Sequence, residues 1–319
     1  MKTPNLQGRS LLTLLDYSPE EIRFLLDLSK QVKDEAKAGE KKARFSGCTL
    51  AMLFEKRSTR TRCAFETAFG EEGGHPVFLS TQDIQLGAKE SIEDTARVLG
   101  RMFSAIQFRG FKQSTVEALA AHSGVPVYNG LTDRFHPTQA LADIMTFQEN
   151  FGQVTGKTLC FVGDGRNNVA RSLMVICSKL GIHFTVVTPP ELNPGAEFLE
   201  TCGALAAESG GKISVSGDTG AVSGAHALYT DVWASMGEED KKTEREALLA
   251  PYQVNAALME KTGRSDAVFL HCLPAVRGEE VTADVIDGPK SRVWDEAENR
   301  KHTIKALMLA TLGALDDRS

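Results

Sequence analysis

Short apolar runs alternate along this chain with longer segments in which apolar residues recur every three or four positions. Runs of Val, Ile, Leu and Phe are typical of buried strands, and the longer spacing is typical of helices that bury one face. In the first half this pattern predicts strands at 49–54, 76–79, 105–108 and 125–129 and helices at 18–39, 58–69, 89–101, 114–122 and 137–150. In the second half it predicts strands at 158–162, 183–187, 212–215, 227–229 and 267–270 and helices at 168–180, 196–208, 241–249 and 298–312.

Strands that alternate with helices indicate an α/β protein whose mostly parallel sheets are covered by helices on both faces. Two such series predict two domains, residues 1–148 and residues 149–298, with the last helix, 299–319, packing back on the first domain. In an open parallel sheet, ligands bind beyond the carboxyl ends of the strands. Polar or loop-forming residues follow five of the predicted strands, namely Ser58, Arg109, Gly163, Asp231 and His271. We therefore expect one active site in the cleft between the two domains.

The composition is that of a globular protein with a slight excess of acidic residues. The 319 residues include 36 Lys and Arg against 42 Asp and Glu, so the formal net charge is −6. A nucleic-acid-binding protein is usually basic, so we expect no nucleic-acid partner. No apolar run has the length of a membrane span and no signal pattern opens the sequence, so we expect no membrane association. The six cysteines contain no C-x-x-C pair, which predicts no metal site and a reducing compartment, the cytoplasm.

The segment Ser58-Thr59-Arg60-Thr61-Arg62 follows a predicted strand and opens a predicted helix. Guanidinium groups, hydroxyls and the free N–H groups of a helix start together form a cradle suited to phosphate. On an acidic protein, such a local positive site suits a small anion. The alternative is a capped helix whose arginines lie on a solvated face, and this motif alone favours neither interpretation.

Pro137 stands at the first turn of the predicted helix at 137–150, where its missing N–H costs little. His136 then lies just outside the helix and can direct a ring nitrogen at a ligand oxygen. Gln139 offers both a donor and an acceptor, which suits an amide-like group. The alternative is an ordinary helix start with a structural histidine.

The segment Gly163-Asp-Gly-Arg-Asn-Asn168 lies between a strand and a helix, so it suggests a dinucleotide-binding loop. Asn168 replaces the third glycine of that motif, and the strand at 183–187 ends in Thr-Pro-Pro with no acid nearby except Glu191. These departures disfavour NAD. Asn168 can instead meet a substrate carboxylate or amine at the helix start.

Asp231-Val-Trp-Ala-Ser235-Met236-Gly237 follows a predicted strand and precedes a charged run. A carboxylate at a strand end, followed by a loop of small residues, can bind a cationic substrate amine. The alternative is the end of a strand and a solvated surface loop.

His271-Cys272-Leu273-Pro274 also follows a predicted buried strand. Pro274 disfavours a helical conformation at Leu273 and so leaves backbone carbonyls as acceptors. Cys272 has no obvious partners for a thiol triad, so we favour a binding role for it over a covalent one.

Three of these segments, 58–62, 136–139 and 271–274, closely resemble those of the ornithine carbamoyltransferase family, and the resemblance extends nearly end to end from Asn5. The first two resemble the carbamoyl phosphate site shared by carbamoyltransferases. Residues 231–237 and 271–274 resemble the ornithine-specific signature, since aspartate carbamoyltransferases lack the Ser-Met-Gly loop and putrescine-specific relatives carry a different sequence there. Residues 85–90 resemble the family loop that reaches toward the phosphate, usually from a neighbouring subunit. The segment between Pro274 and Trp294 is short for the family.

The resemblance implies a role for each matching residue on the carbamoyl phosphate side. The residues implied to hold the phosphate are Ser58, Thr59, Arg60, Thr61, Arg109 and, across a trimer interface, Gln85. The residues implied at the carbamoyl group are Thr61, Arg109 and His136 at its oxygen, Gln139 and the Leu273 backbone at its nitrogen, and Arg300 through its backbone.

On the other side, the resemblance implies a set of ornithine-binding residues, namely Asn168, Asp231, Ser235, Met236 and Cys272. Asp231 and Cys272 would flank the δ-amine, and with Arg109 and His136 they form the implied catalytic set. The implied assembly is a homotrimer or an assembly of trimers. The first domain would bind carbamoyl phosphate and the second would bind ornithine.

The implied reaction transfers the carbamoyl group of carbamoyl phosphate to the δ-amine of L-ornithine, giving L-citrulline and phosphate. It serves arginine biosynthesis or, in reverse, arginine degradation, and this acyl transfer requires no metal and no organic cofactor. One alternative is a carbamoyltransferase for putrescine or an acylated ornithine. The other is a catalytically silent binding subunit of the same fold, against which the intact Arg60, Arg109, His136 and Cys272 count.

Overall fold

The computed structural model describes residues 4–80, 90–234 and 242–315. The chain divides into two compact units, unit 1 (Met1–Met145 with Glu298–Ser319) and unit 2 (Thr146–Ala297). The chain passes from the first unit to the second within helix α5 (Pro137–Phe151) and returns within helix α11 (Val293–Thr311). Among the described residues, no helix is both long enough and apolar enough to cross a membrane.

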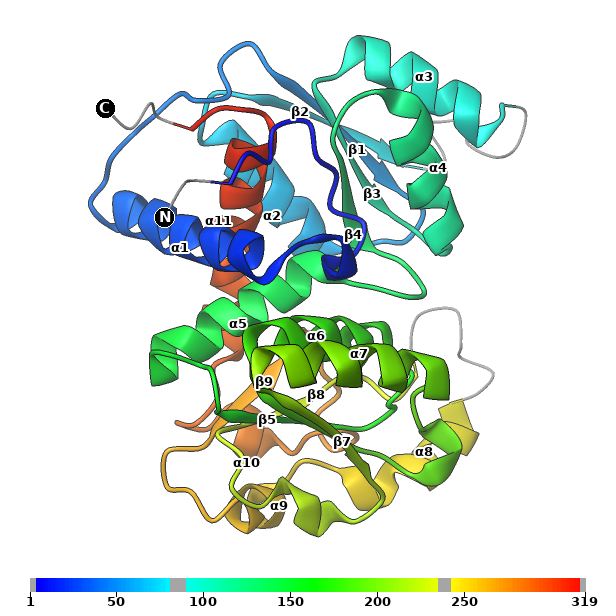
Figure 1. Ribbon diagram of the computed structural model, residues 1–319, viewed down its shortest axis with the longest axis vertical. Helices are drawn as coiled ribbons and strands as arrows, with labels where there is room; N and C mark the ends of the chain where they lie inside the picture. Colours follow the sequence, from blue (N-terminus) through cyan, green and yellow to red (C-terminus); the bar gives the residue numbers. More distant parts are fainter. Residues whose placement is uncertain (1–3, 81–89, 235–241, 316–319) are drawn as a thin grey trace. The chain divides into compact units, whose positions relative to one another are not determined.

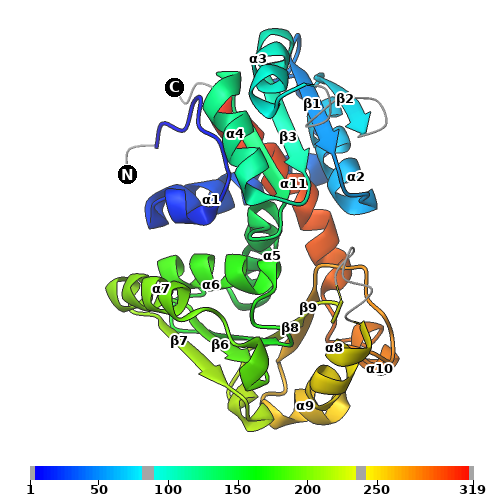
Figure 2. The ribbon, with the colours of Figure 1, turned by 90° about the vertical axis from the view of Figure 1, so that its right-hand side faces the viewer.

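Unit 1 contains a parallel four-stranded sheet with the strand order β2-β1-β3-β4. Its strands are β1 (Thr49–Phe54), β2 (His75–Ser80), β3 (Ala105–Arg109) and β4 (Val127–Leu131). Its helices, besides parts of α5 and α11, are a 3-10 turn (Leu14–Asp16), α1 (Pro19–Lys37), α2 (Thr59–Gly70), α3 (Ile92–Met102) and α4 (Gln113–Ser123). Helices α3 and α4 lie on one side of the sheet, and α2 and α11 lie on the other (Figures 1 and 2).

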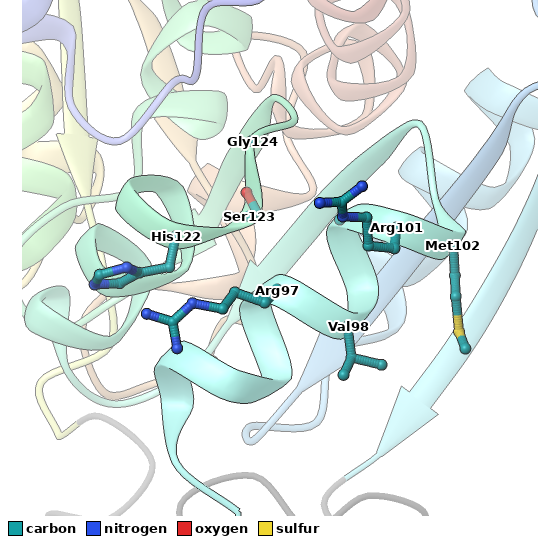
Figure 3. A pocket seen from close by; sticks show the side chains of 8 residues that line it. Arg97, Val98, Arg101, Met102, His122, Ser123 and Gly124 are labelled. Carbon is teal, nitrogen blue, oxygen red and sulfur yellow. The ribbon is translucent and has the colours of Figure 1, made fainter.

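The two faces of this sheet are buried by different helices. On one face, Leu53 and Phe108 pack with apolar residues of α3 and α4. Helices α3 and α4 approach closely at Gly100, because any Cβ there would lie 1.8 Å from the backbone oxygen of Ser123. Near this crossing lies a hollow of about 850 Å³, which the ends of the two helices line (Figure 3). On the opposite face the ring of Tyr128 stacks on Phe65 of α2, and its hydroxyl lies 2.7 Å from that of Thr311 in α11.

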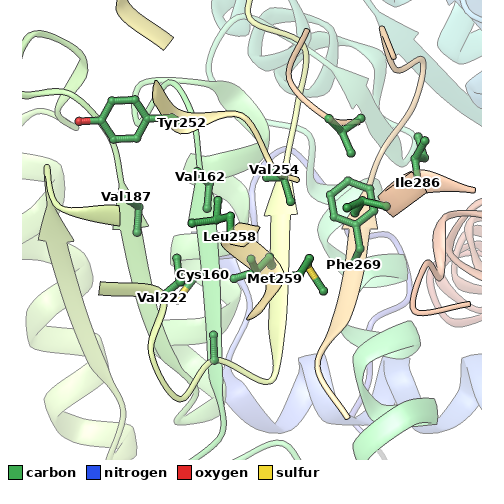
Figure 4. Packing of buried hydrophobic residues seen from close by; sticks show 14 of the residues in the cluster. Cys160, Val162, Val187, Val222, Tyr252, Val254, Leu258, Met259, Phe269 and Ile286 are labelled. Carbon is green, nitrogen blue, oxygen red and sulfur yellow. The ribbon is translucent and has the colours of Figure 1, made fainter. Parts of the chain in front are cut away.

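Unit 2 contains a parallel five-stranded sheet with the strand order β7-β6-β5-β8-β9. Its strands are β5 (Thr158–Val162), β6 (His183–Val187), β7 (Lys212–Ser216), β8 (Ala227–Thr230) and β9 (Val268–His271). Its α-helices are α6 (Asn168–Leu180), α7 (Ala196–Ser209), α8 (Lys242–Leu249), α9 (Ala256–Lys261) and α10 (Ala283–Ile286), and its 3-10 helices are Pro190–Leu192, Thr219–Val222 and Ala250–Tyr252. Helices α6 and α7 cover one face (Figure 2). On the other face, Val162 and Phe269 pack against Leu258 and Ile286 of the short helices α9 and α10 (Figure 4).

The strand order reverses once in each sheet. In unit 1 the chain proceeds from β1 outward to β2 and then crosses back to β3 on the other side of β1. In unit 2 it proceeds from β5 through β6 to β7 and then returns to β8 on the other side of β5. Loops that leave adjacent strands at such a reversal diverge to opposite faces and leave a crevice, which is where α/β proteins bind ligands. The reversals thus indicate a ligand site beyond β1 and β3 and another beyond β5 and β8.

The α/β architecture and the two parallel sheets predicted from the apolar pattern are confirmed. Strands β1, β5 and β6 and helix α6 have the predicted bounds. Strand β4 begins at Val127 instead of residue 125. Helix α11 begins at Val293 instead of residue 298, because its first turn carries the exposed Trp294 and two acids and so lacks an apolar period. The short helices α9 and α10 were not predicted, because four to six residues cannot display a helical period.

Candidate active site

The turn between β1 and α2 has features of both interpretations of the segment 58–62, the phosphate cradle and the capped helix with solvated arginines. Ser58 is the N-cap of α2, and its hydroxyl oxygen accepts the N–H of Thr61 at 3.2 Å. Arg60 lies half-buried in the first helical turn, so a guanidinium group accompanies the positive end of the helix dipole. Arg62 is different, because it is exposed, pairs with Glu66 at 3.0 Å and stacks on the ring of Phe78. The cap is therefore real, and Arg60, but not Arg62, is placed for an anion at the helix start.

Two buried guanidinium groups meet at the Thr61 hydroxyl in unit 1. Arg109, the last residue of β3, donates to this oxygen at 3.3 Å, and Arg300 of α11 donates to it at 3.3 Å. Arg109 is 7% exposed and Arg300 is 2% exposed. Two cations held this close in a place of little solvent create a strongly positive potential, which favours a bound anion.

Arg300 also orients the beginning of α5. Its guanidinium group donates to the side-chain oxygen of Gln139 at 2.6 Å and to the hydroxyl of Thr138 at 3.4 Å. The Gln139 amide nitrogen donates to Asp143 at 2.7 Å, so both ends of this amide are fixed. The resemblance implied an approach of Arg300 to the carbamoyl group through its backbone, whereas the contacts that the structure shows are made by its side chain.

His136 lies next to this arginine cluster and is only 4% exposed. Burial lowers its pKa well below the usual 6.5, and the charges of Arg300, Arg109 and Arg60 lower it further. The imidazole is therefore neutral at pH 7. A neutral ring donates one N–H and carries no charge of its own, so it can polarise a carbonyl oxygen without adding a third buried cation.

The site in unit 2 is centred on Asp231, which follows β8 and is 8% exposed. One carboxylate oxygen accepts the amide N–H of Asn167 at 2.9 Å. The other accepts the thiol of Cys272 at 3.2 Å and the backbone N–H of Val232 at 2.8 Å. Asp231 and Cys272 come from the ends of the adjacent strands β8 and β9, and their contact places a carboxylate and a thiol side by side.

Asn167 contacts Asp231 in the site of unit 2, and the sequence analysis did not predict it. Its side-chain oxygen caps α6 by accepting the N–H groups of Val169 and Ala170, while its amide nitrogen holds Asp231. The residue predicted for ornithine, Asn168, is the first residue of the same helix and is half-buried. Asparagine is a preferred N-cap, so a pair of asparagines at a helix start was the available signal for Asn167.

The space next to the glycine-rich loop before α6 is occupied by neighbouring protein groups. A Cβ at Gly165 would lie 2.9 Å from the backbone oxygen of Leu192, and the Gly165 N–H donates to the Thr188 hydroxyl at 3.3 Å. Asp164, in the same loop, pairs with Arg245 of α8. The loop therefore packs on the segment after β6, and this arrangement leaves its backbone engaged where a dinucleotide loop would present it to a pyrophosphate.

His271 fixes the loop that follows β9. Its ring Nδ1 accepts the N–H of Leu273 at 2.8 Å, so the ring proton lies on Nε2, 3.2 Å from a carboxylate oxygen of Glu280. His271 and Glu280 are both fully buried. Leu273 has a φ of 59° and precedes a cis peptide bond to Pro274. His271 therefore acts on the backbone of its own loop, and Cys272 is the member of this segment that reaches Asp231.

The only described group of three residues whose chemistry suits a metal ion is Asp231, His271 and Cys272, whose ligand atoms lie within 4.8 Å of one another. Both ring nitrogens of His271 have protein partners, however, one on Leu273 and one on Glu280. A metal ion would have to break one of these buried contacts. The geometry favours Asp231 and Cys272 as partners of an organic cation.

The sequence profile of the carbamoyl-P binding domain of aspartate/ornithine carbamoyltransferases matches residues 9–149, and that of their Asp/Orn binding domain matches residues 155–311. This chain belongs to the aspartate/ornithine carbamoyltransferase family. The ornithine carbamoyltransferase of Pseudothermotoga lettingae is 69% identical over 97% of this chain and 99% of its own length, and that of Caldanaerobacter subterraneus is 66% identical over the same shares. The solved structure of ornithine carbamoyltransferase from Pyrococcus furiosus is 47% identical, covers 98% of this chain and all of its own, and superimposes with a TM-score of 0.94.

The segment between Pro274 and Trp294, which the sequence analysis expected to be short for the family, forms a compact turn followed by helix α10. The N–H of Gly278 donates to the backbone oxygen of Val281, and a bidentate ion pair between Arg277 and Asp287 closes the segment. This turn directs Glu280 inward, where it also accepts the N–H of Val276 at 2.6 Å. This segment therefore supplies a buried partner for His271.

The residues expected from the resemblance to carbamoyltransferases are placed as follows. Those that the structure brings together in unit 1 are Thr61, Arg109, His136, Gln139 and Arg300, with Ser58, Thr59 and Arg60 at the start of α2. Those at the strand ends of unit 2 are Asp231, Cys272 and Leu273, with Asn168 at the start of α6. Gln85, Ser235 and Met236 lie outside the described residues.

Proposed function

We propose that this chain is an ornithine carbamoyltransferase that forms L-citrulline and phosphate from carbamoyl phosphate and L-ornithine. The observation that carries the proposal is the contact between Asp231 and Cys272 at the ends of the adjacent strands β8 and β9 of unit 2. A carboxylate attracts the cationic amines of ornithine, whereas the carboxylates of an aspartate substrate would be repelled by it. The names and high identity of the relatives support the same substrate.

Carbamoyl phosphate is proposed to bind unit 1. Its phosphate would accept from the hydroxyls and backbone of Ser58, Thr59 and Thr61 and from the guanidinium groups of Arg60 and Arg109. The helix start contributes its dipole, and the arginines contribute charge-assisted hydrogen bonds, which are about twice as strong as neutral ones. The buried arginine pair at Thr61 supports this assignment.

The carbamoyl group is proposed to lie against Arg109, His136 and Gln139. Attack by the amine places negative charge on the carbamoyl oxygen, and fixed donors around that oxygen lower the barrier, each by roughly 3 kcal/mol. The neutral His136 suits this task because its N–H donates without a proton transfer. Gln139, oriented by Arg300 and Asp143, would hold the carbamoyl nitrogen together with the backbone of Leu273.

The acceptor is proposed to bind unit 2, with Asp231 and Cys272 beside the δ-amine. The pKa of such an amine is about 10.4 in water, so less than roughly 0.1% is free base at pH 7. The amine must lose a proton before it attacks, and the cationic Arg60 and Arg109 would favour that loss by repulsion. The proton lost before attack passes to solvent. The new C–N bond then forms, the C–O bond to phosphate breaks, and phosphate leaves with the electron pair and takes up the proton that the nitrogen releases after attack. Asn168, Ser235 and Met236 are proposed to bind the rest of ornithine.

We further propose that the chain acts as a homotrimer, or an assembly of trimers, in the cytoplasm. Gln85, in the segment between β2 and α3, would then contribute to the phosphate site of a neighbouring subunit. Helix α3 supports a subunit contact there, because Val98 is 45% exposed and Met102 is 68% exposed beside the hollow that α3 and α4 line (Figure 3). The free cysteines fit a reducing compartment.

The trimer is tested by subunit mixing. An Arg60-defective chain and a Gln85-defective chain should recover activity when mixed, since a hybrid trimer can assemble one undamaged site. Recovery no greater than the summed parental activities, with subunit exchange verified by mass, would place the site within one chain.

The reaction is tested by citrulline formation with three candidate amines. We expect L-ornithine to be carbamoylated far faster than putrescine or N-acetylornithine at equal concentration. A preference for putrescine or N-acetylornithine would assign the chain to a different carbamoyltransferase. Binding of carbamoyl phosphate without turnover of any amine would indicate a silent subunit.

A further inference from the structure

Glu296, in the first turn of α11, is a fully buried carboxylate that contacts two strands of unit 2. One of its oxygens accepts the hydroxyl of Tyr229 in β8 at 3.1 Å. The other accepts the backbone N–H of His271 in β9 at 3.0 Å. A buried carboxylate is costly unless it is hydrogen-bonded, and these two contacts satisfy it with neutral donors from adjacent strands.

These two donors stand immediately before the acceptor half-site. Tyr229 precedes Asp231 by two residues, and His271 directly precedes Cys272. The ladder between β8 and β9 ends with the pair Thr230 and His271. Beyond that pair, no further ladder pairing of the described residues holds β8 and β9 together, so the distance between Asp231 and Cys272 depends on the side-chain contacts that fix the two strand ends. Glu296 does so from the side, and Thr230 ties β8 to β5 through a 2.6 Å hydrogen bond to Val162.

We propose that Glu296 is a positioning residue for carbamoyl transfer, which sets the contact between the Asp231 carboxylate and the Cys272 thiol. This inference rests on the proposed function of unit 2. Glu296 touches neither reacting group, and its effect is transmitted through Tyr229 and the backbone of His271.

The geometry shows which property of Glu296 is needed. A glutamine at this position can accept the His271 N–H with its oxygen and donate its NH₂ to the Tyr229 oxygen, so both groups keep a partner. An alanine leaves a buried N–H and a buried hydroxyl without that partner. The position of two hydrogen-bonding atoms is required, and the negative charge is not.

The test compares Glu296→Ala, Glu296→Gln and Tyr229→Phe with Asp295→Ala, which removes the neighbouring exposed acid of the same helical turn. For Glu296→Ala we expect kcat/KM for ornithine to fall about 10- to 100-fold, the penalty of an unsatisfied buried donor. The dissociation constant of carbamoyl phosphate, measured by calorimetry, should stay within about twofold, because that ligand is assigned to unit 1. Glu296→Gln and Asp295→Ala should remain close to the wild type in both measurements.

A readout independent of turnover is the alkylation rate of Cys272 by iodoacetamide, resolved by peptide mass spectrometry. A carboxylate beside a thiol disfavours the thiolate, so loss of the Asp231 contact in Glu296→Ala should accelerate labelling of Cys272. Glu296→Gln should label at the wild-type rate. This measurement remains valid if the wild type carbamoylates another amine, so failure of the inference is distinguishable from failure of the proposed substrate.

Two results would overturn the inference. One is wild-type labelling of Cys272 and wild-type ornithine kinetics in folded Glu296→Ala. The other is a glutamine variant as damaged as the alanine variant, which would show that the charge itself is required. If the alanine variant does not fold, Tyr229→Phe decides the matter: it removes one of the two contacts and should accelerate Cys272 labelling to a smaller degree, and an unchanged rate would refute the role.

Discussion

The polar groups beyond the strands of unit 1 are cations and hydroxyls, whereas those of unit 2 are a carboxylate, a thiol and an amide. In unit 1 the positive charges come from residues far apart in sequence, Arg60, Arg109 and Arg300, and two of the three are buried. In unit 2 the carboxylate of Asp231 is placed by short contacts to Asn167 and Cys272. Both sets lie at the reversal of strand order in their own sheet. One fold principle, used twice, has thus produced two half-sites of opposite charge.

Under the proposed function, this difference means that the two substrates would be recognised by different physical means. A phosphate carries its charge on several oxygens and can be met by many donors at once, so a cluster of cations suits it. A flexible amine presents one cationic nitrogen, so a single oriented carboxylate suffices. Changes at the arginines of unit 1 should therefore alter carbamoyl phosphate binding, and changes at Asp231 in unit 2 should alter ornithine use alone. The first three of the following predictions test that separation, and the fourth tests the charge state of His136 in unit 1.

The largest effect is expected from Arg60→Gly. Removal of the guanidinium group from the helix start should lower turnover about a thousandfold or more and abolish measurable carbamoyl phosphate binding in calorimetry. The matched control is Arg62→Gly in the same helix, whose side chain pairs with Glu66 and lies over Phe78. Unchanged carbamoyl phosphate affinity in Arg60→Gly would remove Arg60 from the phosphate site.

The second-largest effect is expected from Asp231→Asn. A buried charged contact that loses one partner costs several kcal/mol, so kcat/KM for ornithine should fall roughly a few hundredfold. Carbamoyl phosphate affinity should stay near that of the wild type, as should both quantities in Asp266→Asn, which alters an exposed ion pair with Arg264. Weakened carbamoyl phosphate binding in Asp231→Asn would contradict the separation of the two half-sites.

Asn167→Ala should have a smaller effect on catalysis than Asp231→Asn and should also lower stability. Loss of the N-cap of α6 should reduce the free energy of unfolding by about 1 kcal/mol. Loss of the amide that orients Asp231 should also lower kcat/KM for ornithine about tenfold. Asn255→Ala removes a comparable cap from α9 and serves as the control, in which stability falls but catalysis does not. Equal kcat/KM values for ornithine in the two variants would show that Asn167 only caps α6 and does not orient Asp231.

His136→Asn should change the pH dependence of stability. Because burial and three arginines lower the folded-state pKa of His136, the unfolded chain binds more protons as the pH falls through 6.5, and the folded state loses stability. For this residue the loss between pH 8 and pH 5.5 should be on the order of 1 kcal/mol, and asparagine should abolish it. Urea unfolding at both pH values measures the difference, and an identical pH dependence in the variant would show that folding does not lower the pKa of His136.

Much of this fold could be predicted because its strands are short, buried and separated by helices with a clear apolar period. Helix α6 begins at Asn168 as predicted, since its apolar face starts there and Gly181 follows its end. The start of α11 was not predictable, because its buried acid Glu296 reads as surface charge until Tyr229 and His271 are folded against it. Local periodicity reports burial of apolar groups and is silent about buried polar ones.

The same limit applies to the candidate site. Arg109 and Asp231 were identifiable because they follow apolar runs, and because motifs of known function contain them. Glu280 acts through His271, which lies nine residues earlier across a turn, and Asn167 acts, beyond its own helix cap, through Asp231, 64 residues later. Residues whose importance lies in orienting another side chain leave a signal only in three dimensions.

Unit 2 is one uninterrupted stretch of chain, Thr146–Ala297, entered through α5 and left through α11. Two crossovers in a gene would therefore suffice to exchange the whole acceptor half for that of a relative, while every arginine of the donor half stayed in place. Under the proposed function, such an exchange would keep the arginines that hold the phosphate, whereas Leu273, proposed to hold the carbamoyl nitrogen, would be exchanged with the acceptor half. The layout therefore suits the construction of chimaeric enzymes from relatives in the laboratory.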